Sequence, residues 1–362
     1  MFCPNNQRTL FNSGEQLPKY KQRLLEKGWP KSFHNEVFPY INEENFAVLY
    51  SNNEATRPNS PVNVLMGLLI IKEVLQLTDE ELIGSLLFDA RFQYAFHTIN
   101  SSEQPVSINT LGNFRRRVTR YFEETKIDLI QIEVEAMAKR IANNLKVDTR
   151  LLRMDSLMIS SSCRNLSRIE LVYSINYLMV KTLHRAGFKV PQSCLGYLEK
   201  GHKNETIYRM VNQEADSKLK TLLDQSDELY QVGLATDEKI MSGKAFKCLE
   251  RLLTEQTVQT EGERIIRPGK EIASDSLQNP SDPDATFRVK GHESHIGYVG
   301  NLVNAYNGQN QVIMNYDLQP NTYSDTQFTA DVMAKLAGEG TETINLVTDG
   351  AFYSDELAQN PG

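Results

Sequence analysis

Two aspartates inside apolar stretches are the residues best suited to chemistry. Asp155 lies in the segment RMDSLMI, and Asp349 lies in the segment LVTDGAF. Both segments read as strands, with the aspartate near the strand end. Ligands of open α/β sheets bind beyond the carboxyl ends of the strands, so the two carboxylates can face one cleft. Such oxygen ligands suit Mg²⁺, which proteins hold through one or two carboxylates and substrate phosphates.

Spacing alone leaves two interpretations of this pair open. Two metal ions at the strand ends can activate the attacking oxygen and stabilise the leaving oxygen of a phosphodiester displacement. Strand-end aspartates are also common caps of the helix that follows. The capping role is the more frequent one, so the pair predicts a metal site only together with other signals.

A cluster of arginines is the second chemical feature. The densest basic group of the chain consists of Arg115, Arg116, Arg117 and Arg120. Positions 116 and 120 share a helical face, and such a cluster can neutralise DNA phosphates with release of counterions. The alternative is a solvated basic face that pairs with Glu123 and Glu124.

Three further polar residues, Lys290, His292 and His295, precede a predicted strand. Lys290 can meet a DNA phosphate near the active site and is therefore a candidate DNA contact. The two histidines lie three residues apart and can suggest a metal pair. Two histidines in a loop are more often polar surface, so they are not candidate ligands.

Three predicted helices position the arginines, over residues 62–76, 79–90 and 108–122. Thr78 and Glu81 form a capping box at the start of the second helix. The third helix carries the arginines, so the three helices can form a helix-turn-helix-like unit. A fourth amphipathic helix is expected over residues 126–143.

The elements that carry the aspartates alternate between strand and helix. In chain order we expect strand 146–162, helical stretch 167–253, connector 257–284, strands 295–306 and 311–320, helix 324–337, and a strand that ends at Asp349. An Asn-Gly turn joins the middle two strands. This order predicts an α/β core with a helical insertion.

Composition favours an intracellular globular protein. The 362 residues are too many for one ordinary core and suggest roughly two or three units. The net charge of −7 argues mildly against a nucleic-acid protein, although a local basic patch can still bind phosphates. Four cysteines without CxxC spacing suit a reducing cytoplasm, and neither a signal peptide nor a membrane span is expected.

Four ordered segments resemble bacterial insertion-sequence transposases. PVNVLMGLLIIKEVLQLTDEELIGSLLFDARFQYAFHT, followed by SINTLGNFRRRV, is similar to their helical N-terminal domain. RMDSLMISSS is similar to the strand that carries their first catalytic Asp, and SDPDATFRVKGHESHIGYVGNLV to the approach to their second strand. NLVTDGAFYS resembles the strand that carries their second catalytic Asp. The resemblance extends over most of the chain from about residue 60.

The resemblance implies a DDE-type transposase with an RNase H-like mixed sheet core. Asp155 and Asp349 would be its first two metal ligands, with Asp155 bridging two Mg²⁺ (or Mn²⁺) ions and Asp349 holding one. A metal-activated water would cut double-stranded DNA at the element end, and the freed 3′-hydroxyl would attack target DNA. The resemblance also implies a homodimer on paired ends, in the bacterial cytosol at the nucleoid.

The same resemblance implies a division of the chain. A helical DNA-binding domain would take residues 1–145, an RNase H-like core would take 146–162 and 281–362, and a helical insertion with its connector would take 163–280. The family's catalytic glutamate lies on a helix well downstream of the second aspartate. Glu356 follows Asp349 too closely for this role and is expected on a helix surface.

We therefore expect an incomplete core that lacks the third carboxylate. A truncated element, one half of a frameshifted reading frame and a fragment all fit this expectation, and cleavage should be badly impaired. Two rival functions stay open. A catalytically dead remnant would bind DNA as a repressor, and a hydrolase of another kind would have only the two aspartates in its favour.

Overall fold

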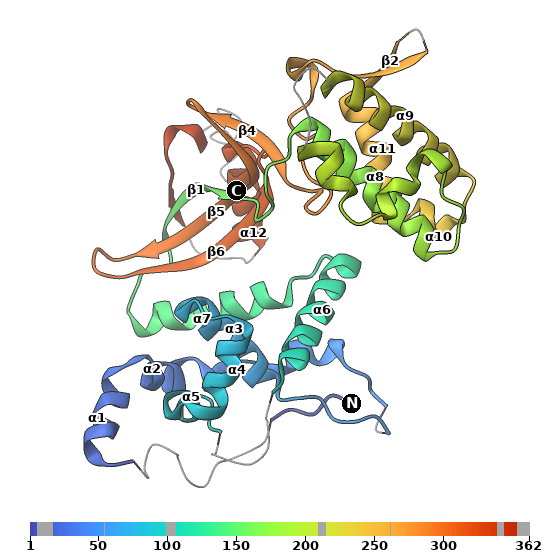
Figure 1. The fold of residues 1–362 in the computed structure, drawn as a ribbon. Coiled ribbons are helices and arrows are strands. Elements are labelled where there is room, and N and C mark those ends of the chain that lie inside the picture. The colour runs from blue at the N-terminus through green and yellow to red at the C-terminus, as the bar shows by residue number, and fades with distance from the viewer. Residues whose placement is uncertain are drawn as a thin grey trace. The chain divides into compact units, whose positions relative to one another are not determined.

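Helices build the N-terminal part of the chain (Figure 1). The computed structural model describes residues 1–5, 17–53, 55–98, 106–208, 215–260, 262–338 and 344–352. The first helices are α1 (Lys19–Lys27), α2 (Trp29–Glu36), α3 (Val62–Leu75), α4 (Asp79–Phe88), α5 (Ala90–Ala95), α6 (Ile108–Thr125) and α7 (Leu129–Asn144), with 3₁₀ turns η1 (Phe38–Tyr40) and η2 (Glu43–Leu49). The predicted helix over 79–90 ends early because Asp89 caps a new helix, α5.

Local sequence signals explain where these helices begin. The Thr78 hydroxyl accepts a hydrogen bond from the Glu81 amide at 3.2 Å, and the Glu81 carboxylate accepts one from the Thr78 amide at 2.8 Å. The predicted capping box of α4 is therefore confirmed. Ser107 caps α6 in the same way, by accepting from the Thr110 amide.

The helices share one apolar core. Phe46, Leu68, Leu82 and Phe114 are fully buried there, and each such side chain stabilises the fold by about 1.5–3 kcal/mol. Gly67 lets α3 approach its neighbours, since a Cβ at this position would lie 2.7 Å from the Phe96 ring. The core thus depends on close helix packing as well as on apolar composition.

One sheet contains both the strand that carries Asp155 and the strand that Asp349 follows. Its strands are β1 (Leu151–Ser160), β4 (Thr286–Lys290), β5 (Glu293–Tyr306), β6 (Gln311–Pro320) and β7 (Asn345–Val347). The order is β4-β5-β1-β7, and β6 also pairs with β5. Helix α12 (Asp325–Gly338) connects β6 to β7 and buries Phe328 and Val332. The α/β fold class is confirmed, but β4 was not predicted because its five residues directly adjoin a turn.

Two glycines reveal how β1 and β5 run. A Cβ on Gly297 would lie 2.2 Å from the Ile159 carbonyl oxygen, so the two backbones are in close contact. A Cβ on Gly300 would lie 3.6 Å from Leu157 Cγ. From Gly297 to Gly300 the residue number rises along β5, while the contacted residue on β1 falls from Ile159 to Leu157. The two strands are therefore antiparallel. Asp155 therefore lies further along β5, toward the β5–β6 turn.

The helical insertion between β1 and β4 is present, as predicted. Its elements are α8 (Arg168–Arg185), η3 (Gln192–Leu198), η4 (Asn204–Tyr208), α9 (Ala215–Leu234), α10 (Glu238–Met241), α11 (Lys244–Arg251) and η6 (Leu252–Gln256). Ser167 and Glu170 form a capping box at the start of α8. Val172, Leu229 and Leu249 belong to a second apolar core that these helices share.

The predicted connector over 257–284 is wrong over its first ten residues. β2 (Thr257–Thr260) and β3 (Glu263–Ile266) form an antiparallel hairpin there, and the short turn η7 (Gly269–Glu271) follows. Arg264 of β3 donates to Asp227 of α9 at 2.7 Å. Strands of four residues carry little periodicity of their own, so tertiary contacts of this kind decide their structure.

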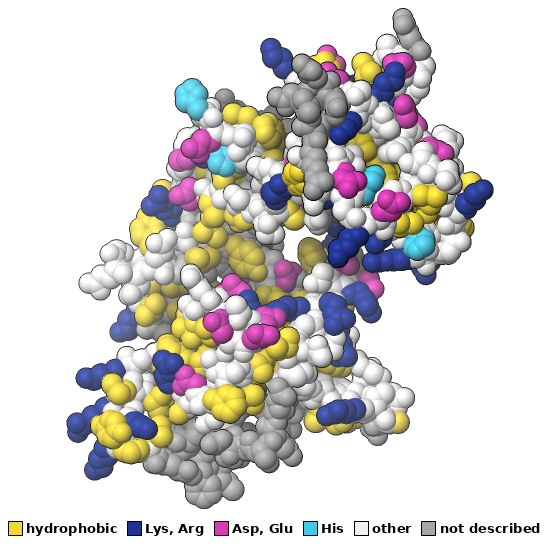
Figure 2. All heavy atoms as spheres, in the orientation of Figure 1, with side chains coloured by type: hydrophobic (Ala, Val, Ile, Leu, Met, Phe, Trp, Pro, Cys, Tyr) yellow, Lys and Arg dark blue, Asp and Glu magenta, His cyan; other side chains and the backbone are white. Residues whose placement is uncertain are grey.

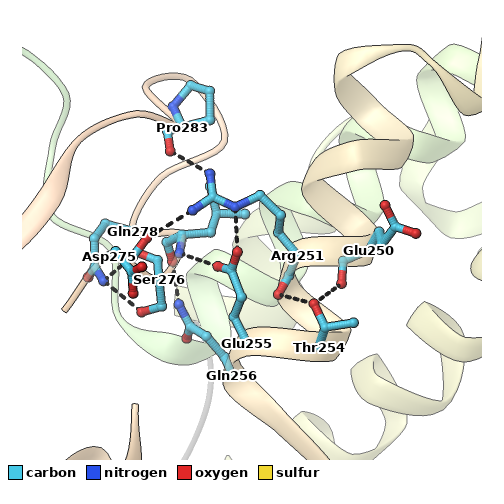
Figure 3. A network of polar contacts seen from close by, with 10 residues as sticks. Glu250, Arg251, Thr254, Glu255, Gln256, Asp275, Ser276, Gln278 and Pro283 are labelled. Atoms are coloured by element: carbon cyan, nitrogen blue, oxygen red, sulfur yellow. Dashed lines mark hydrogen bonds and ion pairs between the residues drawn. The ribbon is translucent and has the colours of Figure 1, made fainter. Parts of the chain in front are cut away.

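A polar network holds the rest of the connector against α11 (Figure 3). Arg251 donates to the Glu255 carboxylate at 2.6 Å, to the Pro283 carbonyl oxygen at 2.7 Å and to the Asp275 carbonyl oxygen at 3.0 Å. Glu255 also accepts from the Leu277 amide at 2.7 Å. Each guanidinium nitrogen of Arg251 thus finds an oxygen, which fixes the path of residues 275–283.

Two compact units emerge from these contacts. Unit 1 contains Met1–Leu151 and Asn304–Asn315, and unit 2 contains Leu152–Val303 and Tyr316–Gly362. The tip of the β5–β6 hairpin belongs to unit 1, where the Asn307 amide donates to the Lys146 carbonyl oxygen at 3.3 Å and the Asn315 amide donates to Glu135 at 3.2 Å. This connection was not predicted, because it joins residues far apart in the chain.

Within the described ranges, none of the helices combines the length and the apolar character that crossing a bilayer requires. Cys3, Cys163, Cys194 and Cys248 are all free thiols.

Candidate functional site

Asp155 lies in the middle of β1, which corrects the prediction of a strand end. It is the fifth of the ten residues of this strand. The strand continues past Asp155 because its end stays in contact with β5, where the Ser161 amide donates to the Ile296 carbonyl oxygen at 2.9 Å. The carboxylate therefore projects from a face of the sheet and not from the end of a strand.

The open face of the sheet carries the Asp155 side chain, which is 61% exposed. Leu157 and Ile159 share this face and are also exposed, while Leu152 and Met154 on the opposite face are buried. The alternation directs Asp155 away from the core. Its carboxylate is consequently accessible to a cation and to a nucleic-acid strand.

Arg153 is the charged neighbour of Asp155. Its guanidinium lies 3.8 Å from the carboxylate, and both side chains are 61% exposed. Ion pairs that are this exposed contribute at most about 1 kcal/mol, so a metal ion can displace Arg153. Arg153 was not among the residues predicted from the sequence, although residues two apart on a strand share a face.

Asp349 lies two residues beyond β7 and is exposed. β7 is the neighbour of β1 in the sheet, and neighbouring strands lie about 4.8 Å apart. The structure thus places Asp155 within β1 and Asp349 just beyond the end of the adjacent strand β7, both in unit 2. Asp349 also directly precedes the turn η8 (Gly350–Phe352), so the capping interpretation of this residue stays open.

The carboxylate pair fits a hard divalent cation. Within the described ranges, no group of three or more His, Cys, Asp or Glu side chains is gathered to hold a metal. Glu356 lies outside the described residues. Mg²⁺ keeps several waters and is usually held by one or two carboxylates together with substrate phosphates, so a pair of carboxylates is compatible in number and chemistry with such an ion.

The arginines of α6 have different surroundings. Arg115 forms a two-point ion pair with Asp79 of α4, at 2.7 and 2.9 Å. This hydrogen bond lowers the pKa of Asp79 and raises the pKa of Arg115. Arg116 donates to the Asn113 side chain at 2.7 Å. Arg115 therefore pairs across helices, and not with Glu123 or Glu124 as the alternative prediction proposed.

Arg117 and Arg120 line a groove of about 900 Å³ in unit 1. Arg57 is a third cation in its wall, and the described lining residues include no carboxylate. The Arg117 guanidinium lies 5.0 Å from the centre of the Tyr50 ring. Burial raises the pKa of Tyr50 although Arg117 opposes the shift, so the phenol keeps its proton and can donate to an anion.

The groove explains how an acidic chain can offer an anion site. The net charge is −7, but Lys and Arg side chains are interspersed with Asp and Glu over the face shown in Figure 2. Arg57 was not identified from the sequence because it lies in an irregular segment before α3. Only the tertiary fold brings it to the same groove as α6.

Lys290 lies at the end of β4, where it pairs with Glu293 of β5. Gly297, four residues further along β5, is already level with the end of β1. Lys290 therefore lies beyond the end of β1, while Asp155 lies back in the middle of that strand. The structure does not bring Lys290 next to Asp155.

The fold and these sites define an α/β protein whose helical N-terminal unit carries a basic groove. Residues 22–117 match the family model described as Transposase domain (DUF772). The match supports the resemblance over these N-terminal residues and, at a coarse level, a transposition enzyme. The match covers roughly a quarter of the chain and lies in unit 1. Neither a curated protein nor a solved structure matches the chain.

Proposed function

We propose that the protein is a DDE-type DNA transposase with an RNase H-like core. The observation that carries this proposal is the position of Asp155 within β1 and of Asp349 two residues beyond the neighbouring strand β7, in a chain with a transposase domain. Asp155 and Asp349 would hold Mg²⁺ or Mn²⁺, and double-stranded DNA would be the substrate.

The strand order supports an RNase H-like core. β5 and β6 form a hairpin on one side of β1, and α12 leads from this hairpin to β7 on the other side of β1. The strand with the first aspartate is therefore central, and the strand with the second aspartate is its neighbour. This is the arrangement that a two-carboxylate metal site in such a sheet requires.

The residues of this chain have distinct proposed tasks. Bound divalent ions supply an activated water and stabilise the leaving oxygen. Asp155 would hold them from the open sheet face, where there is room for a DNA phosphate. Arg153, which lies 3.8 Å from the Asp155 carboxylate, would turn to the phosphate once a metal takes its place.

The groove in unit 1 is the proposed DNA-backbone contact. Arg57, Arg117 and Arg120 line it, and neutralisation of phosphates by such cations supplies most of non-specific DNA affinity. Arg115 and Arg116 have partners within the protein and contribute less. Of the four arginines that the sequence indicated, Arg117 and Arg120 are the proposed DNA contacts, and Arg57 joins them.

Manganese binding tests the metal site apart from catalysis. Asp155→Asn and Asp349→Asn should each weaken Mn²⁺ binding by about tenfold or more, because each removes a charged oxygen ligand. Titration calorimetry measures this effect. Asp224→Asn removes an exposed carboxylate on α9, outside the site, and should bind Mn²⁺ as the wild type does. Equal affinities in all four proteins would reject the metal site.

A second candidate function is DNA binding without cleavage. It is favoured because the family match and the basic groove both lie in unit 1. Metal-dependent nicking of DNA that contains the flanks of the coding sequence, with loss of nicking in Asp155→Asn, would support the transposase. DNA binding with no nicking in the wild type would support the second function.

A further inference from the structure

A pocket in the helical insertion has no role in either candidate function. Its volume is about 660 Å³, and α8, the loop after η3, the start of α11 and the connector line it. Pockets of this size commonly bind small molecules. Its walls combine tyrosine rings with lysine side chains.

Tyr173 and Tyr197 form the floor of the pocket and are 3% and 2% exposed. The Tyr173 hydroxyl lies 2.9 Å from His202 Nδ1, and the Tyr197 hydroxyl donates to Gln225 at 2.8 Å. Burial raises the pKa of Tyr173 to about 12, so its phenol stays neutral. These hydrogen bonds hold both rings in fixed positions.

Tyr177 lies at the mouth of the pocket. It follows Tyr173 by one helical turn on α8, but its side chain is 41% exposed. The Lys181 ammonium lies 5.4 Å from the centre of the Tyr177 ring. An exposed ring beside a fixed aromatic floor is a surface on which another planar ring can stack.

Lysines give the pocket a positive balance. Lys200, Lys203 and Lys244 line it, and Glu199 is the one acidic residue of its described lining. Among the described residues, none forms an ion pair with Lys200 or Lys203. Lys244 donates to the Ser281 carbonyl oxygen at 3.1 Å. The charges of Lys200 and Lys203 are therefore available to an anion.

The connector completes the pocket wall through Pro280 and Ser281. The Arg251 network fixes the path of this segment (Figure 3). A wall that is tied to α11 by several hydrogen bonds does not have to be ordered when a ligand binds, which lowers the entropic cost of binding.

We propose that this pocket binds an unpaired nucleotide of a DNA strand, with the base stacked on Tyr177 and the phosphate held by Lys200 and Lys203. A stacking ring beside a cationic wall is the arrangement that binds single-stranded nucleic acid without sequence preference. A free nucleotide carries the same chemistry. The choice of a DNA strand rests on the proposed function of the whole chain.

The test uses the full chain in EDTA with a single-stranded 12-mer that contains 2-aminopurine, whose fluorescence changes when the base stacks. Excess duplex DNA occupies the groove of unit 1. Tyr177→Ala should weaken binding by about fivefold to a hundredfold, and Tyr177→Phe should restore it because the ring is kept. Lys200→Gln should lower the slope of log affinity against log salt by about 0.7.

A matched control distinguishes binding at this site from a general effect of the protein's positive charge. Lys247→Gln removes an exposed lysine of α11 outside the pocket and should leave binding unchanged. Equal binding by wild type and Tyr177→Ala, or an equal loss in Lys247→Gln, would overturn the proposal. A third outcome is that the strand does not bind, while deoxyadenosine monophosphate binds and depends on Tyr177 in the same way. The pocket would then be a nucleotide site, but for free nucleotides and not for a DNA strand.

The outcome is independent of the metal site. The assay contains no divalent metal, so failure of the Asp155 and Asp349 assignments cannot change it. Conversely, Tyr177→Ala should keep the wild-type affinity for Mn²⁺, because Tyr177 lies in the helical insertion and not on the sheet. Failure of either proposal can therefore be recognised separately.

Discussion

Arg115 and Arg117 lie two residues apart on α6 and have different surroundings. Arg115 is held by Asp79 at 2.7 Å, while Arg117 lines a groove without a carboxylate in its described wall. The sequence identified the cluster but could not separate its members, because the separation depends on which helix packs beside α6. The ion pair with Asp79 of α4 gives Arg115 a structural role, whereas Arg117 remains in the groove, where it can meet an anion.

His97 makes the stability of unit 1 depend on pH. Burial lowers its pKa from 6.5 to about 4, and His34 acts in the same direction. The folded ring therefore stays neutral, while the unfolded chain takes up a proton below pH 6.5. The unfolding free energy should fall by about 1–2 kcal/mol as pH drops from 6.5 to about 4, measured by urea unfolding.

A matched variant isolates this effect. His97 has a left-handed φ of 55°, which asparagine tolerates well. His97→Asn should remove that part of the pH dependence and keep the fold, whereas His184→Asn, at an exposed position in α8, should follow the wild-type profile. If His97→Asn keeps the full wild-type slope, another group is responsible for the pH dependence.

At the scale of elements, Gly297 controls the pairing of β1 with β5. Its φ is 153°, and a Cβ there would lie 2.2 Å from the Ile159 carbonyl oxygen. Gly297→Ala should therefore lower the unfolding free energy by about 3 kcal/mol or more, because a backbone atom cannot move aside cheaply. Chemical denaturation followed by circular dichroism measures the change.

Gly112→Ala provides the comparison for Gly297→Ala. Position 112 lies inside α6, and a Cβ there meets nothing within 4 Å. The substitution should raise stability by about 0.5–1 kcal/mol, since alanine favours helix over glycine. A Gly297→Ala protein as stable as the wild type would mean that β1 and β5 do not approach as closely as described.

Long periodic elements were predictable, and three of the short strands were not. α3, α6, α12 and β6 follow from their apolar spacing, and Thr78 marked the start of α4. β2, β3 and β4 have four or five residues each, too few for a period to emerge above chance. The two aspartates were identified, but Asp155 was expected near a strand end, whereas β1 continues for five residues beyond it.

For the whole molecule, the sum of charges is a poor guide to DNA binding. The chain has a net charge of −7, yet the groove of unit 1 gathers three arginines. Each neutralised phosphate of duplex DNA contributes about 0.9 to the slope of log affinity against log salt. Arg117→Gln combined with Arg120→Gln should therefore lower this slope by about 1.8.

Fluorescence anisotropy of a labelled duplex at several salt concentrations measures the slope. Arg116→Gln is the matched control, since Arg116 is exposed on the same helix but bonds to Asn113. Arg116→Gln should change the slope by less than the value of about 0.9 that one neutralised phosphate contributes. A wild-type slope in the Arg117 and Arg120 double variant would exclude the groove as the backbone contact.

The hairpin tip in unit 1 restricts how this protein can be divided or recombined. Asn304–Asn315 belongs to the same unit as Met1–Leu151, although more than 150 residues separate them in the chain. A gene fragment that ends near codon 151 would encode an N-terminal portion without the asparagines that bond to Lys146 and Glu135. Unit 1 is therefore not one continuous stretch of the chain, and it cannot be exchanged through a single junction without losing the residues of the hairpin tip.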